Sequence, residues 1–328
     1  MKTINSLQAG RAIAALAVVV HHTGQSTNAF SDSFPRLIHN LSLYGYLGVD
    51  FFFVLSGFII YYTSSNMDRV NLFFGKRLRR IFIPYLPVGL TLAIAYTYLP
   101  EISQSDREWS WLATITLLPH DKPTALSVAW TLQHEMIFYA IFALCLLAKQ
   151  VDYGMYLWAL IIIAVNMSGL EVSRAWKFFT APINLEFVMG VVASKIILQK
   201  RAIPRFVLPI AAMILFFIFF AHYDGMPSHS VIFGLGVTLL VINTAHQELD
   251  HDIDIPRTVI FLGAASYSIY LIHYPFLAIT SRILGPYGWP LSYILGFVIA
   301  ALAGCLYHLF WEKPMLRILS PKKARKTG

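Results

Sequence analysis

The chain has 328 residues, of which 57% are hydrophobic and 13% are charged, and its mean hydropathy is +0.62. Soluble domains average about 45–50% apolar and about 25% charged residues, so this chain could not cover its surface with polar groups. The composition therefore excludes a soluble globular protein, and 15% aromatic residues with so little charge exclude a disordered one. An integral membrane protein remains, in which lipid solvates most of the surface.

The net charge of +8 arises from 25 Lys and Arg against 17 Asp and Glu. Most of the basic residues lie in short connectors between apolar runs, which indicates topology-setting charge and no nucleic-acid partner. The two cysteines, Cys145 and Cys305, fall inside apolar runs. They are typical of packing residues, so we expect neither a disulfide nor a metal site.

Crossing a bilayer takes about 20 mostly apolar residues, with some tolerance for tilt and interfacial flanks. Ten runs of the sequence meet this requirement and predict an all-α, polytopic membrane protein with a single domain over residues 1–328. The predicted spans cover residues 7–24, 45–63, 81–98, 128–148, 153–170, 181–198, 206–222, 228–246, 264–281 and 291–311.

Orientation follows from the distribution of Lys and Arg between alternate connectors. With the N-terminus inside, the inner segments hold 18 of these residues, counting Lys195 near the inner end of the sixth span, and the outer loops hold six. The positive-inside rule then predicts that both termini are cytoplasmic, with a basic tail at about 313–328. One inner segment, 246–261, is unusual because it carries several acidic residues, Glu248 among them.

The first span contains a buried arginine and two histidines. Arg11 and His22 are eleven residues apart, so they share one face of a helix at a separation of roughly 16 Å along its axis. An ionisable side chain at bilayer depth costs at least about 2.5–3.5 kcal/mol, which makes each such residue a functional candidate. A lone membrane histidine is otherwise often a packing residue.

The second span carries Asp50, which needs a partner or a wet cavity and could either counter Arg11 or orient a histidine. Small residues on the same span, Gly48, Ser56 and Gly57, favour close contact between helices.

A basic cluster follows, in what the spans predict to be a connector. It consists of Lys76, Arg77, Arg79 and Arg80. Arginine pairs bidentately with phosphate oxygens, so the cluster suits a polyphosphate ligand. From charge alone, ordinary cytoplasmic anchoring or contact with lipid headgroups explains the cluster better.

Three later spans add further polar side chains. Glu135 and Tyr139 share a helix face, Glu186 opens the sixth span, and Tyr270 and His273 share a face of the ninth. Together with the residues above, they are typical of a general-base site near the outer leaflet and an anion site near the inner one.

These residues resemble the acyltransferase-3 family of membrane O-acyltransferases, in the short form that lacks an appended hydrolase-like domain. The resemblance covers about residues 5 to 315, in the family's order. It rests on Arg11 with His22, the run from Gly48 to Phe58, Arg77 to Ile81, Trp130 to Leu132 with Glu135, Glu186 and Phe187 with Gly190, Ser266 to Leu271 with His273, and Glu312 with Pro314.

The resemblance implies a bacterial inner-membrane enzyme that takes an acyl group, most simply acetyl, from cytoplasmic acyl-CoA. The acceptor would be a hydroxyl of a cell-surface or exported glycan, or of a lipid-linked sugar. It leaves the oligomeric state open, a homo-oligomer included, and implies no metal. We expect Lys76, Arg77, Arg79 and Arg80 to hold the donor phosphates.

The expected catalytic residues are Arg11 and His22, with Glu135 or Asp50 orienting the histidine. The expected acceptor contacts are His273, Tyr270 and Glu186.

Two alternatives use the same residues differently. In a proton-coupled transporter or glycan-export component, the intramembrane His and Glu would relay protons. Such proteins commonly show repeats with paired broken helices, and no repeat is evident in this sequence. An acyl-CoA-regulated binding protein would keep the arginine cluster and tolerate the loss of His22.

Overall fold

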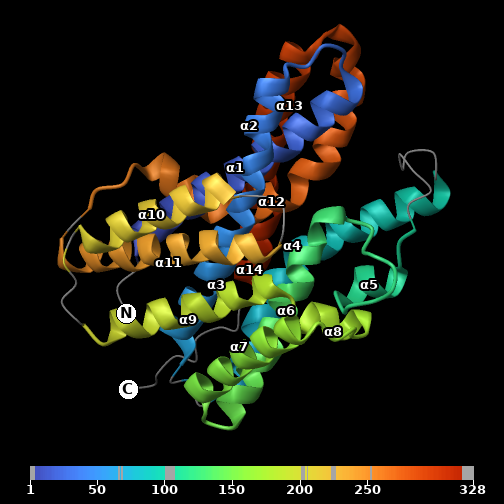
Figure 1. Ribbon diagram of the computed structural model, residues 1–328. Helices are drawn as coiled ribbons and strands as arrows, with labels where there is room; N and C mark the ends of the chain where they lie inside the picture. Colours follow the sequence, from blue (N-terminus) through green and yellow to red (C-terminus); the bar gives the residue numbers. More distant parts are fainter. Residues whose placement is uncertain are drawn as a thin grey trace, which may run out of the picture.

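A computed structural model describes residues 4–65, 67, 69–99, 108–200, 204, 206–222, 227–251 and 253–319. Within these ranges every regular element is helical, as the apolar runs predict (Figure 1). Lipid offers no hydrogen-bond partners, so a segment that crosses it must satisfy its own backbone, which a helix does.

The helices are α1 (Asn5–Phe30), α2 (Arg36–Leu43), η1 (Tyr44–Leu47), α3 (Gly48–Ser64), α4 (Val70–Tyr98), α5 (Trp111–Thr116), η3 (Ser127–Ala129), α6 (Trp130–Leu147), α7 (Val151–Ser168), α8 (Arg174–Phe179), η4 (Pro182–Asn184), α9 (Leu185–Leu198), α10 (Val207–His222), α11 (Pro227–Asp250), α12 (Arg257–Leu284), η5 (Gly285–Tyr287), α13 (Trp289–Tyr307), η6 (His308–Glu312) and α14 (Lys313–Ile318).

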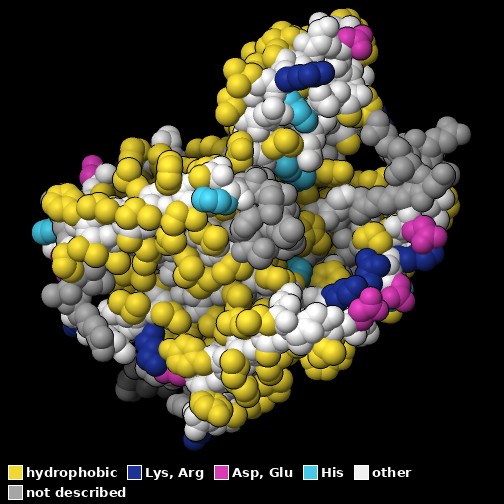
Figure 2. Space-filling model, viewed as in Figure 1, with side chains coloured by type: hydrophobic (Ala, Val, Ile, Leu, Met, Phe, Trp, Pro, Cys, Tyr) yellow, Lys and Arg dark blue, Asp and Glu magenta, His cyan; other side chains and the backbone are white. Residues whose placement is uncertain are grey.

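Each of the ten predicted spans overlaps a helix, and eight helical segments of the described residues are long and apolar enough to cross a membrane. The other two are α10, which is apolar but has 16 residues, and α1, whose polar residues lower its hydropathy. Large apolar side chains such as Met213 and Phe217 on α10 are more than half exposed. Hydrophobic side chains cover much of the visible face over α10 and α11 (Figure 2), as expected for lipid contact.

One boundary corrects the sequence analysis. The basic cluster was expected in a connector, but α4 begins at Val70, eleven residues before the predicted span. Lys76 to Arg80 therefore lie on a continuous helix, which decides the directions in which their side chains point.

One acidic residue of segment 246–261, Glu248, has a structural role. Helix α11 runs on to Asp250, and the buried Glu248 accepts hydrogen bonds from the backbone N–H groups of Asn5 and Ser6, at 2.6 and 2.7 Å. A carboxylate at a helix N-terminus satisfies free donors and complements the helix dipole. Glu248 thus caps α1.

Helix α1 runs parallel to α12 and antiparallel to α3. Ser266 bonds to Arg11 and Leu277 bonds to Ser26, so residue numbers rise together along α1 and α12. Helix α3 in turn packs closely on α9, where a Cβ atom added at Gly57 would collide with the carbonyl oxygen of Phe187. The predicted close-contact role is confirmed for Gly57 and, against α1, for Gly48.

Helix α4 contains two prolines, Pro84 and Pro87, and a proline removes the hydrogen bond to the carbonyl four residues earlier. Pro87 frees the carbonyl of Ile83, which accepts instead from the Trp311 indole at 3.0 Å. The Tyr307 hydroxyl donates to the carbonyl of Pro84 at 2.7 Å. Side chains from the end of α13 and from the π-helix η6 are therefore hydrogen-bonded to the backbone in the middle of α4.

Candidate active site

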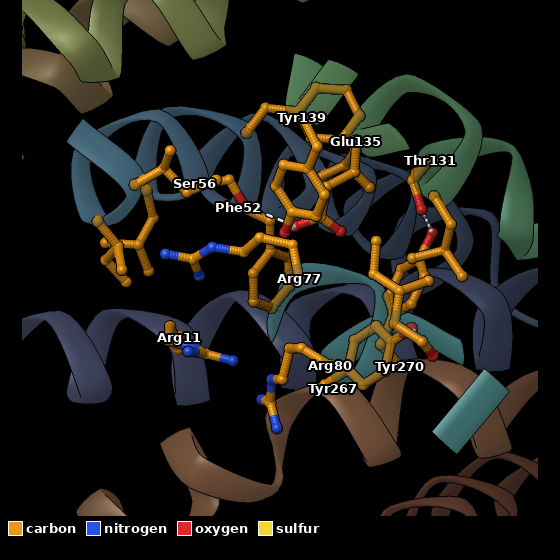
Figure 3. A pocket seen from close by; sticks show the side chains of 17 residues that line it. Arg11, Phe52, Ser56, Arg77, Arg80, Thr131, Glu135, Tyr139, Tyr267 and Tyr270 are labelled. Atoms are coloured by element: carbon orange, nitrogen blue, oxygen red, sulfur yellow. Dashed lines mark hydrogen bonds between the residues drawn. The ribbon is translucent and has the colours of Figure 1, made fainter. Parts of the chain in front are cut away.

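A cavity that is partly open to solvent lies among α1, α3, α4, α6 and α12. Figure 3 shows Arg11 and Arg80 on one side of it and Glu135 and Tyr139 on the opposite side. Its polar lining consists of Arg11, Ser56, Arg77, Arg80, Thr131, Glu135, Tyr139, Tyr267 and Tyr270. Five helices distant in sequence thus contribute to one polar space inside an apolar bundle.

Two of the four predicted phosphate-binding residues line this cavity. Arg77 and Arg80 are three apart, so α4 presents them on one face. Arg79 turns elsewhere and donates to the backbone carbonyl of Leu319 at 3.1 Å. Lys76 is exposed and does not line the cavity.

The three arginines of the cavity have different partners. The Nε of Arg11 donates to the Ser266 hydroxyl at 3.1 Å, and no ion pair of the described residues includes Arg11. Arg77 donates to the Thr63 hydroxyl at 3.2 Å and lies over the Tyr139 ring. Arg80 is held by an ion pair with Glu312. Because Arg11 forms no such pair, its charge is available to a ligand.

Glu135 forms the acidic wall of the cavity. It accepts hydrogen bonds from the Ser56 hydroxyl at 3.2 Å and from the hydroxyl of Tyr139, one helical turn further along α6. The nearby hydroxyls of Thr131 and Tyr270 bond to each other at 2.9 Å. Glu135 was expected to orient His22, but the structure joins it to Ser56 and Tyr139 instead.

His22 lies outside the cavity lining, as its distance along α1 from Arg11 requires. Its Nδ1 is 3.2 Å from the side-chain oxygen of Gln25, three residues on. Its ring centre lies 5.1 Å from that of His273, which is 5.7 Å from that of Tyr270. Because Tyr270 lines the cavity, His273 connects His22 to it. The shared face of Arg11 and His22 is the one that packs on α12.

His273 is fully buried, and its Nδ1 donates to the carbonyl of Ile269 at 3.1 Å. Its Nε2 has no hydrogen-bond partner in the structure. With Nδ1–H donating, Nε2 carries a free lone pair beside His22. The same reasoning applies to His22, whose Nδ1–H donates to Gln25 and leaves Nε2 as the basic atom.

Asp50 and Glu186 neither line the cavity nor reach His22. They form a neighbouring pair of carboxyl groups on α3 and α9, and each is almost fully buried. One oxygen of Asp50 and both oxygens of Glu186 lack hydrogen-bond partners. The expectation that Asp50 orients a histidine or counters Arg11 is wrong, because its neighbour is another acid.

The sequence did not predict the roles of two residues near the site, Gln25 and Glu312. Gln25 follows His22 by three positions, a spacing that places both on one helix face. Glu312 was noticed only as part of a closing motif, yet it pairs with Arg80 across 232 residues. The spacing of His22 and Gln25 could have predicted their contact, whereas no local pattern in the sequence predicts the pairing of Glu312 with Arg80.

Comparison with known proteins decides the family. An acyltransferase domain matches residues 4–309. The chain belongs to this acyltransferase family. It is 28% identical to the exopolysaccharide production protein ExoZ of Rhizobium meliloti (strain 1021), a match that covers 83% of this chain and 90% of ExoZ. The expected resemblance is thereby confirmed.

Two further relatives support the same assignment. Acyltransferase MdmB of Streptomyces mycarofaciens is 22% identical over 98% of this chain and 94% of its own length. YrhL of Bacillus subtilis (strain 168), a candidate peptidoglycan O-acetyltransferase by its name, is 25% identical over 95% of this chain and 55% of YrhL. No solved structure matches the acyltransferase. Its described residues contain no group of three or more His, Cys, Asp or Glu that could hold a metal ion.

Proposed function

We propose that this acyltransferase moves an acyl group, most simply acetyl, from cytoplasmic acyl-CoA to a hydroxyl of an exported or cell-surface glycan. Family membership supports acyl transfer. The names of ExoZ and YrhL refer to exopolysaccharide production and peptidoglycan O-acetylation, which favours a glycan or lipid-linked sugar as acceptor. The bacterial inner membrane is the location that suits both substrates, and both termini would be cytoplasmic.

The observation that carries this proposal is a cavity inside the helical bundle lined by three arginines and one glutamate. Excess positive charge inside a bilayer is costly unless an anionic ligand enters, and the phosphates of acyl-CoA are such anions. Arg77 and Arg80 would contact them, whereas Lys76 and Arg79 lie on the same helix but do not line the cavity.

The reaction requires a base. His22 would accept the proton of the acceptor hydroxyl at Nε2, because Gln25 keeps its Nδ1 protonated. The hydroxyl oxygen then forms a bond to the acyl carbon, the thioester carbon–sulfur bond breaks, and His22 returns the proton to the sulfur. A variant of this scheme has His22 carry the acyl group transiently, as a covalent intermediate.

Arg11 stabilises negative charge on the donor, either on a phosphate or on the thioester oxygen. Its offset of roughly 16 Å from His22 along α1 favours the phosphate. His273 and Tyr270 lie between the cavity and His22, where the acceptor would bind. Asp50 and Glu186 lie outside the cavity, so this scheme gives them no contact with either substrate.

The test is His22→Ala in membranes supplied with radiolabelled acetyl-CoA and a candidate glycan. We expect loss of label from the glycan by about 10²–10⁴-fold, the usual contribution of a general base, while the protein still inserts. His222→Ala, at an exposed histidine of α10, serves as the matched control and should label the glycan normally. Full glycan labelling by His22→Ala would refute the proposed role.

The transporter alternative has one observation in its favour. The buried pair of Asp50 and Glu186 is a carboxyl pair of the kind that proton pathways use. The same assay separates the two functions, because a transporter would move the glycan without attaching label to it.

A further inference from the structure

A buried network lies behind the arginine side of the cavity, centred on Glu312 in η6. The side chain of Glu312 is 0% exposed and does not line the cavity. It accepts hydrogen bonds from the Ser268 hydroxyl at 2.6 Å and from Nδ1 of His308 at 2.7 Å, and it forms an ion pair with Arg80. Two of these donors, Ser268 and His308, hold the carboxylate on the side away from Arg80.

Arg80 connects this network to the cavity. Its side chain is 33% exposed, it lines the cavity, and its guanidinium lies 5.4 Å from the centre of the Tyr267 ring. Arginine has five N–H donors in a planar fork, so a single carboxylate leaves several of them free. Glu312 therefore accepts from one edge of the Arg80 guanidinium, and the ring of Tyr267 covers one face of that guanidinium.

The backbone around Glu312 is fastened to the same helix that carries Arg80. Trp311 and Tyr307 donate to backbone carbonyls at Ile83 and Pro84 of α4. The segment His308–Glu312 is a π-helix, a rare feature that occurs frequently at functional sites. The distance from Glu312 to Arg80 is thus fixed by two independent backbone anchors.

We propose that Glu312 is a positioning residue, which holds the guanidinium of Arg80 at the cavity wall so that its free N–H groups meet the phosphates of the donor. The inference rests on the proposed function, because it assumes an acyl-CoA donor. Glu312 itself touches neither donor nor acceptor and acts only through Arg80.

Because Glu312 is negatively charged, the direction in which its removal changes donor binding distinguishes two explanations. If Glu312 merely lowered the positive charge of the cavity, its removal would strengthen binding of an anionic donor. If it positions Arg80, its removal would weaken binding, since an unanchored arginine adopts many rotamers. The two explanations predict opposite changes in the dissociation constant of the donor.

The experiment measures binding of radiolabelled acetyl-CoA to the full-length protein in detergent. We expect Glu312→Gln to raise Kd about tenfold or more, because an amide offers a single acceptor oxygen to three donors and removes a partly buried charge pair. Glu312→Asp should recover part of the affinity. In the Arg80→Gln background, Glu312→Gln should change Kd by less than about twofold, since coupled residues are not additive.

The matched control is Asp152→Asn. Asp152 also bonds to a cation and a hydroxyl, those of Lys195 and Tyr61, but it does not line the cavity. We expect Asp152→Asn to leave Kd within about twofold even where it lowers thermal stability, because the pair is partly exposed and remote.

Each outcome has one meaning. Unchanged or tighter binding by Glu312→Gln overturns the positioning role, as does an equal loss in the Arg80→Gln background. Failure of the wild-type protein to bind acetyl-CoA overturns the proposed donor, and this inference with it.

Discussion

Arg11 is the cavity residue whose proposed role is most directly testable by substitution. Among the described residues its side chain donates to the Ser266 hydroxyl, and only through Nε, so the rest of its fork is available to the donor. Lysine would keep the charge but not the planar fork, which matters where two oxygens of one anion are bound together. The identity of this residue, and not its charge alone, should therefore matter for binding.

We predict that Arg11→Lys lowers kcat/KM for acetyl-CoA about tenfold or more, the cost of losing one or two charge-assisted hydrogen bonds. Initial rates of glycan acetylation at varied donor concentration measure it. Arg282→Lys, at the C-terminal end of α12 and over the Phe30 ring, is the control and should behave as the wild type. An Arg11→Lys enzyme with unchanged kcat/KM would show that charge alone suffices.

The contact between His22 and Gln25 is a local one, within a single helix. Gln25 is on the next turn of the same helix and fixes which ring nitrogen carries the proton. A sequence shows this spacing directly. It does not show that His273 lies opposite, because that residue is brought there by the pairing of α1 with α12.

Among the elements, α4 and the pair formed by α3 and α9 do most to place the site. Helix α4 carries Arg77 and Arg80 into the cavity only because it is already helical at those positions. Helix α3 approaches α9 so closely that glycine is required at the crossing, since Gly57 faces backbone atoms of Phe187 and Gly190 faces those of Val54. Side chains there would push the helices apart.

We predict that Gly57→Ala destabilises the protein by about 1–3 kcal/mol, the usual cost of overpacking. At about 2–4 °C per kcal/mol, the midpoint of thermal unfolding in detergent should fall by several degrees. Gly296→Ala is the control, because it is also buried in a helix but its new Cβ would meet atoms no nearer than 3.5 Å. A fall of the same size in both variants would contradict the packing argument.

For the whole molecule, the central question is which side faces the cytoplasm. The excess of Lys and Arg in alternate connectors predicts that the turn between α6 and α7 is inside and that the one between α7 and α8 is outside. Both turns contain exposed residues, Gln150 and Ser173 respectively. They can therefore report sidedness without disturbing a packed helix.

We predict that, in a background lacking Cys145 and Cys305, Ser173→Cys reacts with a membrane-impermeant maleimide in intact cells. Gln150→Cys should react only after the cells are permeabilised. The positive-inside rule gives this pattern, and the measurement is the extent of labelling under each condition. The reverse pattern would place the arginine side of the cavity outside and exclude cytoplasmic acyl-CoA as donor.

The sequence by itself determined the class of this protein, the positions of its spans and the family. Apolar runs predict helices because lipid leaves the backbone no other hydrogen-bond partners, and this rule needs no tertiary contact. It also singled out Arg11, Arg77, Arg80, Glu135 and Tyr270, which line one cavity. Charged residues at bilayer depth are few enough to be recognised one by one.

Only the tertiary structure decided which of these side chains meet. Asp50 pairs with Glu186, Glu135 bonds to Tyr139 and Ser56, and Arg80 is held by Glu312. The last of these contacts joins residues 232 apart in sequence. Periodicity fixes the face of one helix on which a residue lies, whereas the identity of its partner depends on how two helices cross, and the crossing is set by packing along their whole length.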